Sequence, residues 1–294
     1  MGKKYIELKN GETYAYLEKG TGDKVLILIH GNLSAGIYYK PLMDRLPDDV
    51  HAYALDLRGF GDSSYLNPFN SLAELATDVK LFMNQLKIEK ATIVGWSLGG
   101  GIAMEFASRH QKSVDKLILI NSTTHKGYPI FKKDDSNAPI FTQGYETKEK
   151  MATDPVQVKP MLEALATQNK FFMSYVYDLT IYTNHKPQQE MNDIYIKETL
   201  KQRCLVDADW ALASLNMSDT PNLYQKGDNG IKHIEADTLM FWGALDKTVP
   251  EYMVLDNYNA LKPKAKYIRY ESCGHSPLVD KPDELTEEIL KFIK

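Results

Sequence analysis

Apolar and polar positions divide the first third of the chain into alternating strands and helices. Residues 13–18 alternate as a half-buried strand does, whereas residues 25–29 form a continuous apolar run, typical of a strand buried on both faces. Apolar side chains recur at helical spacing over residues 72–86, and apolar runs at 91–95 and 117–120 follow. This alternation predicts an α/β fold with a mostly parallel central sheet and helices on both faces. The other elements predicted in this part are a helix at 38–46, a strand at 51–55 and a helix after residue 97.

The pattern changes in the middle of the chain. Residues 123–236 contain helix-like stretches and polar loops broken by prolines, with no apolar run typical of a buried strand. The alternation of strands and helices then resumes and continues to the last residue. We therefore predict a core made of residues 1–122 and 237–294, with a helical cap, residues 123–236, inserted after the sixth strand. The elements predicted in the second core segment are strands at 238–242 and 266–270 and helices at 251–261 and 284–293.

A Gly-x-Ser-x-Gly motif, residues 95–99, joins the strand at 91–95 to the next helix. Its serine, Ser97, is the candidate nucleophile, because a serine on a sharp turn between a strand and a helix forms a nucleophile elbow. Glycine at both ends of the motif removes side chains that would clash in such a turn. The helix directs free N–H groups towards any negative charge that develops beside Ser97. The context therefore predicts an activated hydroxyl in a site prepared for an oxyanion.

A serine nucleophile needs a general base and a carboxylate that orients this base. His275 stands in a turn-rich loop after a predicted strand, and Asp246 directly follows another strand. Asp256 and Asp280 compete with Asp246, but neither follows a strand end directly. Ser97, Asp246 and His275 thus lie in the chain order Ser…Asp…His, each just past the carboxyl end of a strand, where open α/β sheets carry their sites. We predict that these three residues are catalytic.

The segment after the buried strand at 25–29 is placed to supply a backbone N–H to the oxyanion. Asn32 is the preferred donor there and Leu33 is the alternative. The second donor is the N–H of Leu98, the residue after the nucleophile. A simpler interpretation of the same segment is a glycine turn. We interpret His30, which precedes this turn, as a structural residue.

The inserted segment is expected to set the choice of substrate. Leu33 and Trp96 from the core and Phe171 and Trp210 from the insertion are the candidate pocket residues. An aromatic lining suits small or medium apolar acyl groups better than highly charged substrates. The alternative is that most of these aromatic side chains pack the cap onto the core. Further aromatic residues considered for the pocket are Phe131, Phe141, Phe172, Tyr175 and Tyr177.

A glycine-containing loop, residues 56–63, follows the strand at 51–55. Its aspartate, glycine and serine residues predict a tight loop that is bonded to itself. A phosphate-binding interpretation is weaker, because no Gly-Lys-Ser/Thr follows. The glycines at 99–101 likewise form no dinucleotide fingerprint, and no cluster of histidine, cysteine and aspartate has metal-ligand spacing. We therefore expect no metal.

Composition narrows the class of partner. The 294 residues carry a net charge of −4, so the chain lacks the basic footprint of a nucleic-acid-binding protein. The longest apolar run is too short to span a bilayer, and the first residues lack the apolar core of a signal peptide. We expect a cytoplasmic protein, a monomer or a homodimer, that acts on a small-molecule ester or lactone and binds neither nucleic acid nor membranes.

Taken together, these motifs resemble the α/β-hydrolase superfamily, in particular its esterase, lactonase and haloperoxidase-like branch. The resemblance implies a Ser97–His275–Asp246 triad, no cofactor and a helical cap between the two core segments. Ser97 at the nucleophile position argues against the relatives that use an aspartate nucleophile, namely epoxide hydrolases and haloalkane dehalogenases. One departure is Asp237, where relatives often carry proline. The residues that carry the resemblance are His30-Gly31, Asp56-x-Arg58-Gly59-x-Gly61-x-Ser63, Gly95-x-Ser97-x-Gly99-Gly100, Trp242-Gly243-x-x-Asp246 and Gly274-His275-Ser276.

The predicted activity is hydrolysis of carboxylic esters of small to medium apolar acyl groups through an acyl-enzyme. One alternative keeps the triad and changes the substrate, to a lactone, including an acyl-homoserine lactone, or to a C–C bond. Another alternative, of a different class, is a non-catalytic ligand-binding protein on a hydrolase scaffold, because a fold does not fix a function.

Overall fold

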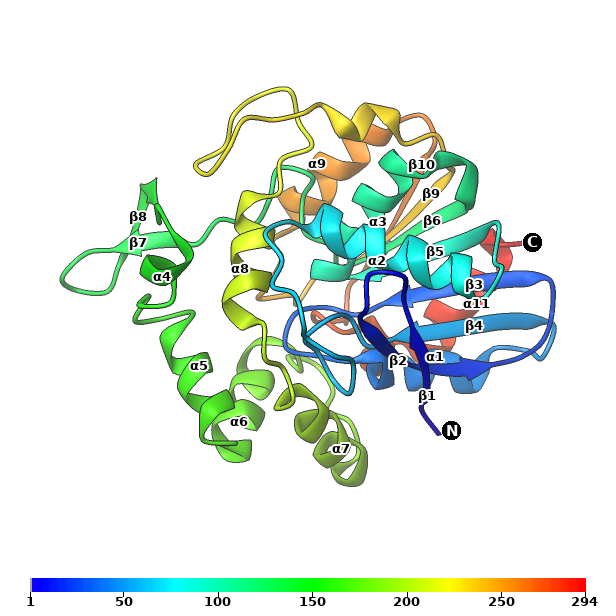
Figure 1. The fold of residues 1–294 in the computed structure, drawn as a ribbon, viewed down its shortest axis with the longest axis horizontal. Coiled ribbons are helices and arrows are strands. Elements are labelled where there is room, and N and C mark those ends of the chain that lie inside the picture. The colour runs from blue at the N-terminus through cyan, green and yellow to red at the C-terminus, as the bar shows by residue number, and fades with distance from the viewer. Residues whose placement is uncertain (1) are drawn as a thin grey trace.

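The structure, a computed structural model, describes residues 2–294 (Figure 1). The strands of its central sheet are β1 (Lys4–Glu7), β2 (Thr13–Lys19), β3 (Lys24–Ile29), β4 (Val50–Leu55), β5 (Ala91–Trp96), β6 (Val114–Ile120), β9 (Thr238–Gly243) and β10 (Ala265–Tyr270). Their order across the sheet is β1-β2-β4-β3-β5-β6-β9-β10. β2 is antiparallel to both of its neighbours, and the pairs from β4 to β10 are parallel. The mostly parallel sheet expected from the sequence is confirmed.

Alternate side chains of the strands face two hydrophobic cores, one on each side of the sheet. In β3, Ile27 and Ile29 belong to one core, and Leu26 and Leu28 belong to the other. The continuous apolar run therefore reflects a strand that is covered on both faces, as predicted. Outside the insertion, the α-helices that contribute to the first core are α2 (Leu72–Gln85), α3 (Leu98–Arg109) and α9 (Glu251–Leu261), and those that contribute to the second are α1 (Lys40–Arg45), α10 (Pro277–Asp280) and α11 (Pro282–Phe292).

The insertion between β6 and β9 is mostly helical, and it also contains a hairpin of β7 (Phe131–Lys133) and β8 (Pro139–Gly144). The hairpin was not predicted, because its strands are exposed or half-exposed and so have no apolar run. Figure 1 shows the hairpin and α4 at the left of the molecule, with α8 between them and the sheet, and α5 to α7 below α8. The helices are α4 (Lys148–Met151), α5 (Lys159–Ala166), α6 (Lys170–Thr180), α7 (Gln189–Thr199) and α8 (Leu205–Ser214).

The last part of the insertion packs against the core. Ala208 and Ala211 of α8 lie in the hydrophobic core on the side of α2 and α3, together with Leu215. A short 3-10 helix, Gly230–His233, adds Ile231 to the same core. Packing therefore joins the chain from α8 onward to the core. The boundary between cap and core at residue 236 stays a prediction. The helix α8 thereby reaches from the core to the site.

Two general features of the chain are also placed by the structure. Across residues 2–294, no helix combines the length and the apolar character needed to cross a membrane. Cys204 and Cys273 are free and buried, and burial raises the pKa of both thiols. Both thiols are therefore protonated at neutral pH, which makes them poor nucleophiles.

Candidate active site

Ser97 stands at the junction of β5 and α3 in an unusual backbone conformation, with φ 56° and ψ −120°. Such a conformation costs roughly 1–3 kcal/mol and persists only where the surrounding structure imposes it. A side chain on Gly95 would overlap the Gly99 carbonyl group, and one on Gly99 would overlap the Ile29 carbonyl oxygen. The two glycines thus permit the tight strand-to-helix turn that the motif predicts, and the turn presents the serine hydroxyl at the carboxyl end of the sheet.

His275 and Asp246 form a buried pair at the same end of the sheet. His275 Nδ1 lies 2.7 Å from Asp246 Oδ2, and both side chains are almost fully buried. Asp246 Oδ1 accepts hydrogen bonds from the backbone N–H groups of Thr248 (2.7 Å) and Val249 (2.9 Å). The loop after β9 therefore fixes the carboxylate, and the carboxylate orients the imidazole.

Asp280, the competing carboxylate, has a different role. Its Oδ2 accepts a hydrogen bond of 2.6 Å from the Gly274 N–H, and its Oδ1 accepts one of 2.8 Å from the His185 N–H. Asp280 thus anchors the loop that carries His275, and it does so without contacting the imidazole. The choice of Asp246 over Asp280 agrees with the position of each carboxylate.

Asn121, which the sequence reasoning missed, supports this pair. Its Nδ2 donates hydrogen bonds to Asp246 Oδ2 (2.7 Å) and to the Gly274 carbonyl oxygen (3.2 Å). Asn121 directly follows β6 and has a positive φ of 41°. The rule that sites gather at the carboxyl ends of parallel strands also applies to this residue. The end of β6 was therefore the signal that could have found it.

A cavity of about 330 Å³ opens beside these residues. Ser97 and His275 both line it, together with Asn32 and Leu98. Among the residues that the structure describes, no hydrogen bond joins the Ser97 hydroxyl to the His275 ring. Catalytic hydrogen bonds are often long in the free enzyme and shorten when substrate binds. The cavity therefore brings together the residues that the sequence predicts for the nucleophile, the base and the oxyanion donors.

Of the four candidate pocket residues, the two from the core line the cavity. Leu33 and Trp96 line the cavity, and Trp96 Nε1 also donates a hydrogen bond of 2.8 Å to the His275 carbonyl oxygen. Phe171 and Trp210 do not line it. Aliphatic side chains that the insertion contributes to the wall are Ile130, Val156, Met161, Val176, Ile181, Leu205 and Leu212.

Helix geometry places the side chains of Phe171 and Trp210 outside this cavity. In α6, Met173 and Tyr177 are four residues apart and buried, whereas Phe171 points elsewhere and is 83% exposed. In α8, Trp210 packs edge-to-face on Tyr224, with ring centres 5.6 Å apart. Residue type alone did not show which face of each helix meets the cavity. Of the other aromatic candidates in the insertion, Tyr177 lines it.

The two candidate oxyanion donors of the core loop differ in their hydrogen bonding. The Leu33 N–H donates to Gln202 Oε1 (2.9 Å) and to Asn32 Oδ1 (3.0 Å), so it is already bonded. The Asn32 N–H has no hydrogen-bond partner within residues 2–294. Leu98 is the first residue of α3, where N–H groups have no partner inside the helix. Asn32 and Leu98 therefore remain the preferred pair of donors.

His30 has the structural role that we inferred from the sequence. Its Nε2 accepts a hydrogen bond of 3.1 Å from the Leu57 N–H, which leaves Nδ1–H to donate to the Gly31 carbonyl oxygen at 2.7 Å. Burial lowers the pKa of His30 to about 4. The ring is therefore neutral at neutral pH, and both of its nitrogens are engaged with the backbone.

The family follows from comparison with known proteins. The family model described as the alpha/beta hydrolase fold matches residues 24–282. The chain belongs to the α/β-hydrolase family. This α/β-hydrolase is 26% identical over 270 residues to a pimeloyl-[acyl-carrier protein] methyl ester esterase of Vibrio atlanticus, and the match covers 91% of this chain and 93% of the relative.

Two further proteins resemble this α/β-hydrolase along almost its whole length. A 2-hydroxy-6-oxononadienedioate/2-hydroxy-6-oxononatrienedioate hydrolase of Paraburkholderia phymatum is 25% identical over 300 residues, which cover 99% of this chain and 95% of the relative. The structure of an esterase of Exiguobacterium antarcticum superimposes with a TM-score of 0.75 at 19% identity, covering 100% of this chain and 99% of that one. The structural likeness shows the α/β-hydrolase fold.

The loop at residues 56–63 of this α/β-hydrolase is bonded to itself, as predicted. The Asp56 carboxylate accepts hydrogen bonds from the N–H groups of Gly36 (2.8 Å) and Asp62 (2.9 Å). The Ser63 hydroxyl donates to the Asp56 carbonyl oxygen at 2.6 Å. The loop therefore holds the end of β4 and takes no part in the cavity.

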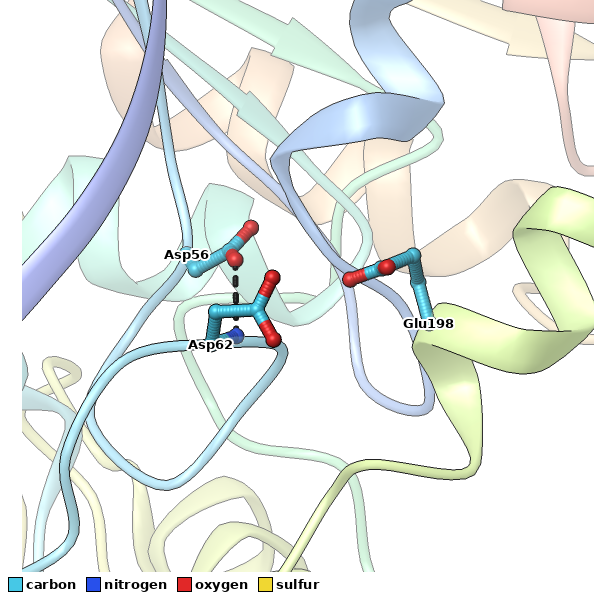
Figure 2. A group of neighbouring side chains, drawn as sticks. All are labelled: Asp56, Asp62 and Glu198. Atoms are coloured by element: carbon cyan, nitrogen blue, oxygen red, sulfur yellow. Dashed lines mark hydrogen bonds between the residues drawn. The ribbon is translucent and has the colours of Figure 1, made fainter. Parts of the chain in front are cut away.

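Asp56, Asp62 and Glu198 bring three carboxylates close together, an arrangement that can hold a metal ion (Figure 2). Lys3 Nζ lies 2.7 Å from Asp56 Oδ2 and 2.7 Å from Asp62 Oδ2. The same ammonium group lies 2.6 Å from Glu198 Oε2. Lys201 Nζ lies 2.6 Å from both Asp62 and Glu198. Two lysines thus supply the positive charge that a metal would bring, and we interpret the cluster as an ion-pair network.

Proposed function

We propose that this α/β-hydrolase hydrolyses carboxylic esters, with Ser97 as nucleophile, His275 as general base and Asp246 as the group that orients the base. The observation that carries the proposal is the buried His275–Asp246 pair, 2.7 Å apart, which opens on the same cavity as Ser97 on its strained turn. This combination is the one that activates a serine hydroxyl. The esterase from Vibrio atlanticus, similar along most of this chain, supports the reaction class.

The hydrogen bonds of Asp246 define the proton positions for the first step. Its oxygens accept from the N–H groups of Asn121, Thr248 and Val249, so the carboxylate acts as an acceptor towards His275 as well. His275 Nδ1 then carries a proton, and Nε2 is left to take the proton of the Ser97 hydroxyl. The serine oxygen attacks the ester carbonyl carbon as this proton moves, and the carbonyl oxygen becomes an oxyanion.

The oxyanion is held by the N–H groups of Asn32 and Leu98, of which the second also benefits from the positive end of α3. The tetrahedral species collapses, the C–O bond to the alcohol breaks, and the imidazolium of His275 gives its proton to the leaving alkoxide. A water molecule then transfers a proton to His275 as it attacks the acyl-enzyme, and the acid leaves as Ser97 regains its proton.

The cavity indicates small to medium apolar acyl groups. Its volume of about 330 Å³ lies at the lower end of the range for ligand pockets. Aliphatic side chains of the insertion, among them Met161, Val176 and Leu212, form its walls. Lactones enter the same mechanism, because ring opening also begins with attack on an ester carbonyl.

Hydrolysis of a p-nitrophenyl ester series from acetate to decanoate tests this proposal. The variant Ser97→Ala should lose turnover by a factor of about 10⁶. Ser108→Ala is the matched control, because Ser108 lies near the far end of α3, the helix that follows Ser97, and donates to the Gly230 carbonyl oxygen, 2.9 Å away. Equal activity of wild type and Ser97→Ala would contradict the proposal, and tight binding without turnover would favour the ligand-binding alternative.

A second candidate is hydrolysis of an anionic substrate on the same triad, including C–C bond cleavage. Lys247 lines the cavity and makes no ion pair with any residue in the described part of the chain. An unpaired ammonium group at a substrate cavity suits a carboxylate. The relative from Paraburkholderia phymatum is named for a dienedioate substrate. Activity on such dicarboxylates that exceeds activity on neutral esters, and falls in Lys247→Met, would support this candidate.

A further inference from the structure

Leu33, the residue after the proposed oxyanion donor Asn32, has a left-handed backbone conformation with φ 52°. This region is unfavourable for a residue with a Cβ atom, and glycine is the usual choice there. A non-glycine residue keeps such a conformation only when several contacts with neighbouring groups hold it there. The contacts of Leu33 therefore show what holds the loop in place.

Insertion side chains bind both polar groups of Leu33. Its N–H donates to Gln202 Oε1 at 2.9 Å. Its carbonyl oxygen accepts a hydrogen bond of 2.7 Å from Thr199 Oγ1 and another from the Tyr177 hydroxyl. All three side chains are buried or nearly so, with Thr199 fully inaccessible and Gln202 only 4% exposed. The insertion thus holds the Leu33 backbone at both its N–H and its carbonyl group.

The side chain of Asn32 is held in the same way. Its Nδ2 donates to Asp209 Oδ1 at 2.8 Å, and its Oδ1 accepts from Gln202 Nε2 at 2.9 Å. Gln202 consequently bridges Asn32 and Leu33 with the two ends of one amide. Every polar side-chain atom of Asn32 is engaged, and its backbone N–H has no partner among residues 2–294. The arrangement leaves that N–H available to a ligand in the cavity.

We propose that Gln202 and Asp209 are positioning residues, which hold the Asn32–Leu33 segment so that the Asn32 N–H is preorganised for the oxyanion. The inference rests on the proposed function, since it assigns a role within the same site. It makes the insertion a determinant of the catalytic rate as well as of substrate fit. Preorganised donors act without reorganising during the reaction, and loss of one such donor lowers kcat by roughly 10²–10³.

Two substitutions that remove the polar atoms and one conservative substitution test the proposal. Gln202→Leu and Asp209→Leu remove the bonds to the loop, and each should lower kcat on p-nitrophenyl butyrate by roughly 10–100-fold with little change in KM, a part of the full donor effect. Asp209→Asn keeps an oxygen that accepts from Asn32, so it should restore most of kcat. The matched control is Gln168→Leu, which loses two main-chain hydrogen bonds of 2.9 Å elsewhere in the insertion.

Inhibition by an alkyl trifluoromethyl ketone gives a readout that simple loosening of the fold would not produce. The ketone forms a hemiketal with the serine, and its oxyanion occupies the same donors as the transition state. The inhibition constant should rise in Gln202→Leu and Asp209→Leu by the same factor by which kcat/KM falls. KM for the ester should stay nearly constant. A parallel rise of KM and of the inhibition constant would instead indicate a damaged cavity and would overturn the proposal.

The outcomes separate this proposal from the proposed function. If Ser97→Ala retains activity, the ester-hydrolase function itself fails. If Ser97→Ala is inactive while Gln202→Leu and Asp209→Leu keep the wild-type kcat, the positioning role is overturned and the function stands. Thermal unfolding of each variant identifies any that does not fold, and in that case the comparison of Asp209→Asn with Asp209→Leu decides.

Discussion

The core and the insertion hold their parts of the site by different means. In the core, Asp246 is fixed by N–H groups of its own loop, Thr248 and Val249, at the end of a buried strand. In the insertion, Gln202 and Asp209 reach Asn32 through side chains that are 170 and 177 residues away in the chain. Substitutions at the core residues of the site should therefore abolish hydrolysis. Substitutions in the insertion should instead lower its rate in part or alter its selectivity.

The largest effect within this comparison is expected at the core carboxylate. Asp246→Asn keeps the shape of the side chain but favours the wrong tautomer of His275. In a serine triad this change lowers kcat by about 10⁴-fold. Steady-state kinetics on p-nitrophenyl butyrate measure it, and Asp280→Asn, which alters the neighbouring loop anchor, should lose far less. A larger loss in Asp280→Asn than in Asp246→Asn would reverse the assignment of the two carboxylates.

A smaller loss of kcat is expected at Asn121, the core residue whose side chain binds the Asp246 carboxylate. Asn121→Gly removes the amide that donates to Asp246 and to the Gly274 carbonyl oxygen, while glycine accepts the positive φ at this position. A hydrogen bond to a charged group is worth about 1.5–3 kcal/mol, which corresponds to roughly 10–100-fold in kcat. Kinetics across pH test this expectation. An unchanged kcat would show that the loop after β9 holds Asp246 without help.

Substitutions in the apolar wall that the insertion contributes to the cavity should alter the selectivity for acyl-chain length more than the rate. Met161→Trp narrows the cavity, so the preferred p-nitrophenyl ester should shift to a shorter acyl chain, with about tenfold discrimination for each methylene that no longer fits. Phe171→Ala is the control, because this side chain is exposed and outside the cavity. A chain-length profile that responds to Phe171 and not to Met161 would contradict the described cavity.

The smallest effect concerns stability and its dependence on pH. Burial raises the pKa of Asp209 to about 7, far above the value near 3.8 of the unfolded chain. The folded protein therefore holds this proton more tightly, and its stability falls as pH rises from about 4 to about 7. Asp209→Asn has no such charge to bury. Its melting temperature relative to wild type should increase across this interval and then level off, as thermal unfolding between pH 4.5 and pH 8.5 can show.

The sequence predicted those parts of the molecule that depend on local pattern. The run at residues 25–29 and the helix at 251–261 follow from periodicity, and Ser97, Asp246 and His275 follow from their places at strand ends. The hairpin of β7 and β8 has no apolar signal. Phe171 lies outside the cavity, because the helix face on which a residue lies, and not its type, decides whether its side chain lines the cavity. The contacts of Gln202 and Asp209 arise from tertiary packing, which a local sequence pattern does not predict.

The central claim, that Ser97 carries the acyl group, can be tested by trapping the intermediate. Wild-type protein and Ser97→Ala are mixed with p-nitrophenyl butyrate, quenched in acid within the first turnover and digested for peptide mass spectrometry. We expect one butyryl group on the peptide that contains Ser97, released on further incubation, and no adduct in Ser97→Ala. Turnover by the wild type with the butyryl group on another residue, or with equal labelling of Ser97→Ala, would contradict it.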